Sequence, residues 1–138
     1  MSAGDLEQIV GQSPIFHGLD TAALTDALDR GRLRNVDAGG IFMHQGEPAL
    51  TFHVLVHGHV KLVQVTPDGH DILARFVRPG QEFGIIAALS GFEYPMSAQA
   101  IDDCQALVWS GEVMAQMIEQ NKNIAFNVMR TLVMRNLS

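Results

Sequence analysis

The 138-residue sequence has almost no cysteine and no long apolar run, and both absences exclude whole classes of protein. Cys104 is alone, so the chain cannot close an internal disulfide, build a zinc site from several thiolates or hold a four-cysteine iron–sulfur cluster. No apolar stretch approaches the ~18 residues of a membrane span, and the first residues lack the basic region of a signal peptide. We therefore expect a cytoplasmic protein without membrane contact.

Charged residues are also scarce. They make up 17% of the chain, against roughly 25% in typical soluble domains, whereas apolar residues reach 47%. Fifteen acidic and nine basic residues give a formal net charge of −6, which repels phosphate backbones and makes this segment a poor candidate for binding nucleic acid. The length fits one domain, and the apolar excess predicts additional burial, for instance at a subunit interface.

The middle of the chain, from Arg32 to Trp109, alternates short strand-like runs with turns that contain glycine or proline. Their spacing of roughly ten residues is typical of an antiparallel sandwich or barrel. Residues 52–56 return through Gly58 into residues 60–65, which turn again through Pro67-Asp68-Gly69 into residues 71–77. The sequence therefore predicts a mainly β fold.

Helical signals flank these strands. Asp20 is a candidate N-cap for a helix over residues 21–29, and Ser110 for a helix that begins after Trp109. A last, apolar helix is expected from about Asn123 to the end of the chain, without a glycine or proline stop. We interpret this end as a cut through a larger protein, or as a helix that needs a partner.

Several segments, taken in order along the chain, carry a family resemblance. They are Pro14–Leu19, Ile41–Pro48, Val56–Leu62, Thr66–His70 and Arg78–Gly84. Together they resemble the sensor half of the Crp/Fnr transcription regulators, and most closely the regulators of dissimilatory nitrate respiration. The resemblance implies a double-stranded β-helix, or jelly roll, of the cyclic-nucleotide-binding-domain fold, with a C-terminal dimerisation helix.

The resemblance also implies a division of the chain and a role. Residues 1–120 would form the effector domain and residues 121–138 the start of the long dimerisation helix, while the helix-turn-helix domain that binds DNA is absent from this chain. The implied role is transcription regulation without enzymatic activity. DNA contact is then expected only through the absent domain.

Nucleotide-binding members of the family use a Glu after Phe-Gly for the ribose, and an Arg before Ser/Thr-Ala for the phosphate. In this chain Ile85 follows Phe83-Gly84, and Met96 precedes Ser97-Ala98. Burial of a phosphate without a cation carries a penalty of several kcal/mol, so cyclic AMP and cyclic GMP are not the expected ligands. The predicted ligand pocket comprises Phe83, Gly84, Ile85, Ile86, Ala87, Met96, Ser97 and Ala98.

Two interpretations of this apolar pocket stay open: a collapsed core, or a site for a hydrophobic ligand. Because the nitrate-respiration regulators sense nitric oxide through haem, the resemblance makes haem a candidate cofactor. Most of the six histidines lie beside turns, where we expect them to be solvated, but His53 lies mid-strand and is expected to point inward or lie at an interface. The motif His57-Gly58-His59 is similar to that of cupin metalloenzymes, but the Glu and the further His that cupins need are missing. We therefore expect no metal site and no catalytic residues.

In the family, the last helix of the sensor half pairs with its twin in a homodimer. The predicted dimer helix uses Ile124, Val128, Met129, Leu132 and Val133, while Asn127, Arg130 and Arg135 are expected to stay solvated. The alternative is a helix packed on its own barrel. The predicted mechanism is a two-state dimer, in which a ligand in the barrel pocket shifts how the two long helices meet.

Overall fold

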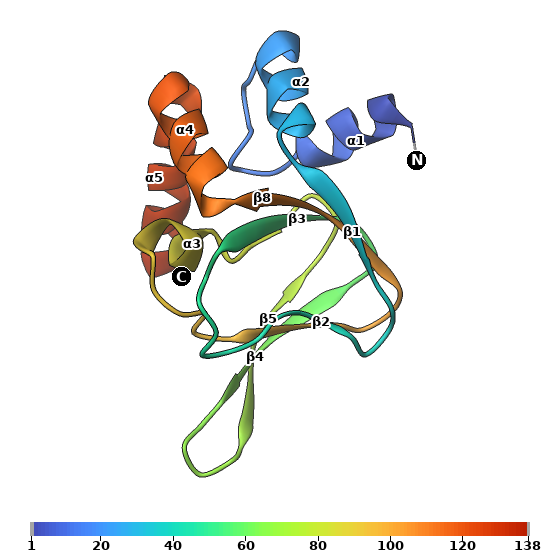
Figure 1. Ribbon diagram of the computed structural model, residues 1–138, viewed down its shortest axis with the longest axis vertical. Helices are drawn as coiled ribbons and strands as arrows, with labels where there is room; N and C mark the ends of the chain where they lie inside the picture. The colour runs from blue at the N-terminus through green and yellow to red at the C-terminus, as the bar shows by residue number, and fades with distance from the viewer. Residues whose placement is uncertain (1, 138) are drawn as a thin grey trace.

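Two four-stranded antiparallel sheets with helices on one side make up residues 2–137, the part of the chain that the computed structural model describes (Figure 1). The strand orders are β1-β8-β3-β6 and β2-β7-β4-β5. The strands are β1 (Arg32–Val36), β2 (Ile41–Met43), β3 (Thr51–His57), β4 (Val60–Val65), β5 (Asp71–Val77), β6 (Glu82–Phe83), β7 (Ser97–Ala100) and β8 (Cys104–Ser110). This arrangement confirms the predicted mainly β jelly roll with flanking helices.

The helices begin largely where polar capping residues place them. They are α1 (Ala3–Val10), α2 (Thr21–Asp29), α3 (Ile85–Ser90), α4 (Gly111–Gln120) and α5 (Lys122–Leu137). The predicted caps are confirmed, since Asp20 accepts a hydrogen bond from the N–H of Ala23 at 2.8 Å and Ser110 accepts one from the N–H of Val113 at 3.1 Å. Helix α1 was not predicted, although Ser2 and Asp5 form a capping box. None of the helices between residues 2 and 137 is long and apolar enough to cross a membrane.

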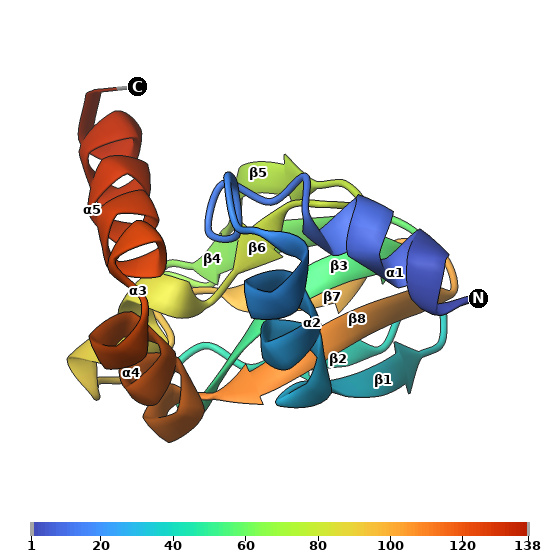
Figure 2. The same ribbon diagram turned by 90° about the horizontal axis from the view of Figure 1, so that it is seen from above.

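Strand β3 is buried on both faces and separates two cores. Its residues Phe52 and Val54 belong to a helix-side core, over which α1, α2 and α4 lie, whereas Leu55 belongs to a barrel core between the sheets (Figures 1 and 2). Trp109 anchors the helix-side core, because its ring stacks on Phe52 at a centroid distance of 4.9 Å and its Nε1 donates to the carbonyl of Ala27 at 2.8 Å. The helices therefore cannot shift freely over the first sheet.

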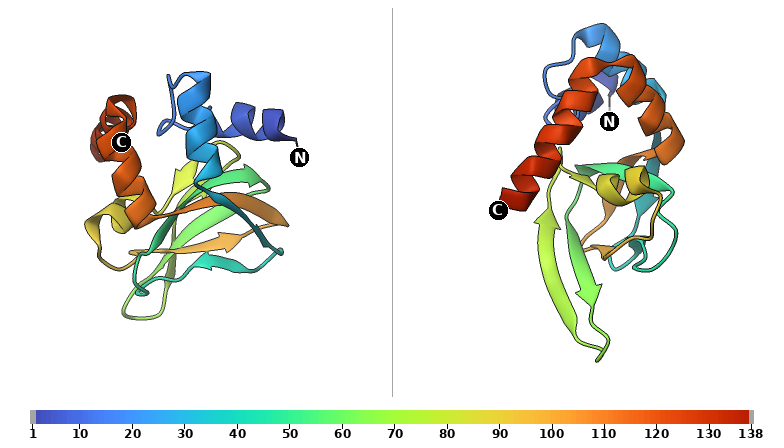
Figure 3. Two further views of the ribbon diagram at one scale, coloured as in Figure 1. Left: turned by 45° about the horizontal axis from the view of Figure 1, so that its top comes forward. Right: turned by 90° about the vertical axis from the view of Figure 1, so that its left-hand side faces the viewer.

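Helices α4 and α5 meet at Asn121, whose extended backbone ends the first helix and whose side chain accepts from the N–H of Asn123 at 2.9 Å at the start of the second. From this corner α5 descends along the side of the barrel (Figure 3, right). The predicted domain division after residue 120 stays a prediction, and Ser138 lies outside the described residues.

The apolar stripe predicted for the dimer helix needs a correction. Ile124 and Val128 are 3% and 7% exposed and belong to the helix-side core, and the half-buried Leu132 packs against the same core. These residues hold α5 on its own domain, which was the alternative interpretation. Of the predicted dimer residues, only Met129 and Val133 are exposed, at 60% and 56%.

Candidate functional site

A cavity of about 340 Å³ lies where α3 and α5 approach the second sheet, and we call it the barrel cavity. Its volume falls in the range of small-molecule sites. Most of its lining is apolar, and the exceptions are two arginines. The lining residues are Met43, Leu62, Ala74, Arg75, Gly84, Ile86, Ala87, Pro95, Met96 and Arg135.

The short helix α3 is set against this cavity by backbone geometry. Gly84, at φ +86°, precedes the helix in a left-handed conformation that other residues adopt only with strain. A β-carbon at Gly84 would also lie 3.4 Å from the sulfur of Met43. On the other side of the cavity, the hydroxyl of Tyr94 donates to the carbonyl of Thr51 at 2.6 Å, which fixes the segment that carries Pro95 and Met96.

The residues predicted for the ligand pocket do not all share one environment. Gly84, Ile86, Ala87 and Met96 line the barrel cavity. Phe83 and Ala98 are wholly buried in the barrel core, and Ser97 accepts a hydrogen bond from the N–H of Gln45 at 2.9 Å. Ile85 requires a correction, because it is buried in the helix-side core and does not line the cavity.

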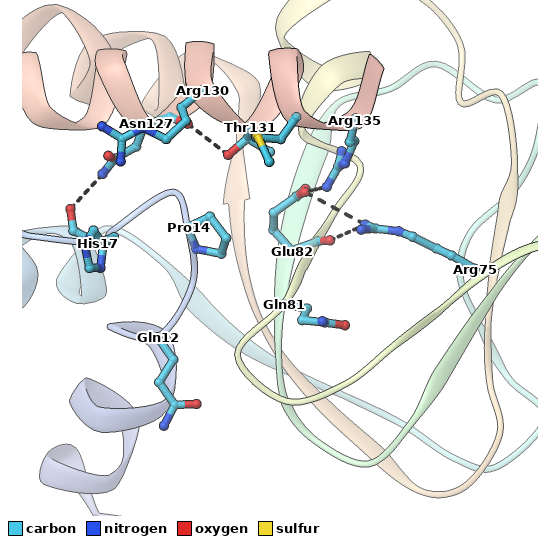
Figure 4. Close-up of a pocket in the computed structure, with 11 residues that line it drawn as sticks. Gln12, Pro14, His17, Arg75, Gln81, Glu82, Asn127, Arg130, Thr131 and Arg135 are labelled. Carbon is cyan, nitrogen blue, oxygen red and sulfur yellow. Dashed lines mark hydrogen bonds and ion pairs between the residues drawn. The ribbon is translucent and has the colours of Figure 1, made fainter. Parts of the chain in front are cut away.

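The charged part of this site was not predicted from the sequence. Glu82 is 2% exposed, and its carboxylate forms ion pairs with Arg75, at 3.8 Å, and with Arg135 (Figure 4). Arg75 also donates to the backbone carbonyl of Glu82 at 2.5 Å. We call these three residues the arginine–glutamate cluster. The expectation of a pocket without a cation is therefore wrong, since two guanidinium groups from β5 and α5 reach the cavity.

The cluster contains two cationic side chains and one anionic side chain. Two guanidinium groups face one carboxylate, and burial lowers the pKa of Arg75. Burial, and next the charge of Arg75, lower the pKa of Arg135 to about 10. Among the described residues, no acidic side chain lines the barrel cavity, and Glu82 lies beside it, paired with both arginines. The cluster therefore brings positively charged donors to the edge of the barrel cavity.

The expectation that Asn127 of α5 stays solvated is wrong. Asn127 is 5% exposed, and its Nδ2 donates to the carbonyls of Ile15 at 3.1 Å and His17 at 2.8 Å. Asn127, Thr131 and Arg135 recur every four residues and so share one face of α5. That polar stripe was the signal in the sequence that this face of α5 meets polar groups: the carbonyls of Ile15 and His17 at one end and the carboxylate of Glu82 at the other.

The histidine expected to point inward does so. His53 is wholly buried, and its ring stacks on Phe83 at a centroid distance of 4.6 Å and meets the edge of Phe42. Burial, and next the charge of Arg34, lower its pKa from 6.5 to about 3, so this ring is neutral at physiological pH. His53 does not line the barrel cavity.

Metal donors are few in this region. Across residues 2–137, no group of three or more His, Cys, Asp or Glu side chains is placed to hold a metal ion. The described lining of the barrel cavity offers only the thioether sulfurs of Met43 and Met96 as axial ligands for a haem iron. A haem held by histidine therefore does not fit this cavity.

Comparisons with known proteins agree on one family. The family model described as the cyclic nucleotide-binding domain matches residues 33–121. A CRP-like cAMP-activated global transcriptional regulator of Mycobacterium tuberculosis is 25% identical over 132 residues, which are 94% of this chain and 58% of that protein. The chain thus spans little more than half the length of that relative.

Solved structures give the same result. The catabolite activator protein of Thermus thermophilus superposes with a TM-score of 0.84 at 26% identity, over 88% of this chain and 57% of that one. The sensor domain of the transcriptional regulator DNR from Pseudomonas aeruginosa superposes with a TM-score of 0.82 at 25% identity. That match covers 94% of this chain and 87% of the sensor domain.

Proposed function

The chain belongs to the cyclic nucleotide-binding domain family of Crp/Fnr-type regulators, and we propose that it is the effector-sensing half of a transcription regulator. The relatives named above are transcription regulators and a sensor domain rather than enzymes. In this proposal a ligand binds in the barrel cavity, and its binding changes the position of a DNA-binding domain outside this chain. The charge of −6 is compatible with that division, because the chain itself need not contact DNA.

The observation that carries this proposal is that α5 contributes to the wall of the barrel cavity. Arg135 lines the cavity and is ion-paired with Glu82 of β6. A ligand in the cavity therefore contacts the same side chain that ties α5 to the barrel. Because a ligand shifts a conformational equilibrium only through differential contacts, Arg135 is the group through which occupancy would change the position of α5.

The lining favours a mainly apolar ligand. Met43, Leu62, Ile86 and Met96 supply most of the wall, and Glu82 already neutralises part of the charge of the two guanidinium groups. Cyclic AMP is the second candidate, because Arg75 and Arg135 line the cavity and would offset part of the desolvation cost of burying a phosphate there. No carboxylate replaces the family's ribose-binding Glu at Ile85, which lies in the helix-side core. Haem stays a prediction of the sequence resemblance.

The exposed face of α5 supports the proposed homodimer. Phe126, Met129 and Val133 are all more than half exposed and recur at three- and four-residue intervals, so they form one apolar strip on the helix. The strip is separate from Ile124 and Val128, which the chain's own core uses. We propose that two copies of α5 meet along this strip.

The barrel cavity is tested with the neutral fluorescent probe N-phenyl-1-naphthylamine, whose emission rises in apolar surroundings. We expect saturable binding that is lost in Met96→Lys, because a buried ammonium repels an apolar ligand, and is kept in Ile101→Lys, which changes a 46% exposed residue outside the cavity. Equal binding by both variants would contradict the proposed site.

Competition then identifies the ligand class. Cyclic AMP, cyclic GMP and haemin are added separately to the probe-loaded protein, and melting temperatures are measured in parallel, since a ligand that binds only the folded state stabilises it. If cyclic AMP displaces the probe and raises the melting temperature, the ligand of this domain is a cyclic nucleotide and not an apolar molecule. Displacement by haemin with a Soret shift would establish haem binding instead.

A further inference from the structure

A second cavity, of about 450 Å³, opens between the N-terminal loop and α5, and we call it the outer cavity (Figure 4). Gln12, Pro14 and His17 form its N-terminal side. Asn127, Arg130, Thr131 and Met134 form its helix side. It shares only the two arginines of the arginine–glutamate cluster with the barrel cavity, and its other lining residues differ.

The outer cavity concentrates positive charge in an acidic protein. Three guanidinium groups, those of Arg75, Arg130 and Arg135, line it together with the carboxylate of Glu82. The whole chain has a net charge of −6 and only nine basic residues. One third of them therefore border this one cavity.

Arg130 differs from the two clustered arginines. Its guanidinium lies over the ring of Phe126 at 5.2 Å from the centroid, and none of the ion pairs found among the described residues involves it. An exposed guanidinium that stacks on a ring keeps its N–H donors available for a carboxylate or phosphate. Arg130 is thus the group from which an anion would gain most.

The rest of the lining suits a compact organic molecule rather than a bare ion. Pro14 and Met134 provide apolar surface, and Gln12 and Thr131 provide neutral polar groups. The Thr131 hydroxyl donates to the carbonyl of Asn127 at 2.9 Å, so its oxygen remains able to accept a hydrogen bond from a ligand. A volume of about 450 Å³ also exceeds what an inorganic ion fills.

We propose that the outer cavity is a second binding site, for a compact organic anion that carries a carboxylate or a phosphate monoester. The anion contacts Arg130, and the organic body lies between Pro14 and Met134. Such a ligand touches both the N-terminal loop and α5, which Asn127 already links through its bonds to Ile15 and His17. It therefore holds α5 against the domain, whether or not the barrel cavity is occupied.

The test measures binding of phenyl phosphate and of benzoate by calorimetry, with benzyl alcohol as the neutral analogue. We expect both anions to bind saturably with Kd below about 1 mM and benzyl alcohol not to bind. Arg130→Ala should weaken the anions by about tenfold, because it removes one charge-assisted contact. The matched control Arg32→Ala removes another exposed arginine, which lies in β1 and outside the lining of the outer cavity, and should change Kd by less than about twofold.

Changes in the amide chemical shifts of the isotope-labelled protein show where phenyl phosphate and benzoate bind. We expect the largest changes at His17 and Thr131, and little change at Ala87 and Met96 of the barrel cavity. The proposal is overturned by the absence of saturable binding of both anions, by equal weakening in the two arginine variants, or by shifts confined to the barrel cavity. The last outcome would support the proposed barrel site while removing the outer one.

Discussion

Acidification should destabilise this domain through its one wholly buried histidine. His53 is enclosed between the rings of Phe42 and Phe83, and its pKa is lowered from 6.5 to about 3, mainly by burial and further by the charge of Arg34. The unfolded chain therefore takes up a proton between pH 6.5 and pH 3 that the folded chain does not. The stabilising contribution is fully present above pH 6.5 and is lost as the pH falls toward 3.

The magnitude follows from these two pKa values. Between pH 7 and pH 5 the linkage relation gives a loss of roughly 2 kcal/mol in the free energy of unfolding from His53 alone. Domains typically have a free energy of unfolding of about 5–15 kcal/mol, and we expect this chain to fall in that range, so the loss is large enough to measure. Urea denaturation followed by Trp109 fluorescence, at several pH values, measures it, because Trp109 is buried in the helix-side core.

Two variants separate His53 from other titrating groups. His53→Leu fits the same apolar surroundings and should lose roughly 2 kcal/mol less than the wild type between pH 7 and pH 5. His70→Leu, at the turn between β4 and β5 where the side chain is 78% exposed, should keep the wild-type pH dependence. If wild type and His53→Leu lose the same stability on acidification, the buried ring is not the cause and the reasoning fails.

Two further predictions concern charge and assembly. Glu82→Gln should lower the free energy of unfolding, measured by urea denaturation, by about 2–3 kcal/mol, because it removes the carboxylate that pairs with two partly buried guanidinium groups. The control Asp26→Asn changes an i, i+4 helical pair near the surface and should lower it by at most about 0.5 kcal/mol. Equal losses in the two variants would contradict the importance of the cluster. Sedimentation should show a dimer at micromolar concentration that becomes monomeric in Met129→Glu/Val133→Glu but not in the surface control Leu33→Glu, and a monomeric wild type would refute the proposed interface.

Local signals in the sequence were sufficient for most of the fold. The N-cap Asp20, the turn at Gly58 and the strand-like run at residues 52–56 each involve neighbours within a few residues, and each predicted an element that the structure contains. The same holds for the inward orientation of His53. The first helix was not predicted, although Ser2 and Asp5 have the spacing of a capping box in the sequence.

The site was predicted only in part, because its residues come from distant segments. The sequence located Gly84 and Met96, which share a cavity, but not Arg75 or Arg135, since nothing near either arginine in the sequence indicates a common partner. Glu82 lies seven residues after the first and more than fifty before the second, and only the folded chain brings the three together.

The sequence by itself determined that the chain is a mainly β sensor domain, that the family's Glu and Arg are replaced by Ile85 and Met96, and that the last helix has more apolar residues than one face can bury. Tertiary structure alone decided which of these apolar residues the domain uses: Ile124 and Val128 are buried and Met129 and Val133 are left exposed. The physical reason is that hydrophobic periodicity shows which residues favour burial, whereas the surface that buries them depends on contacts between segments far apart in the chain.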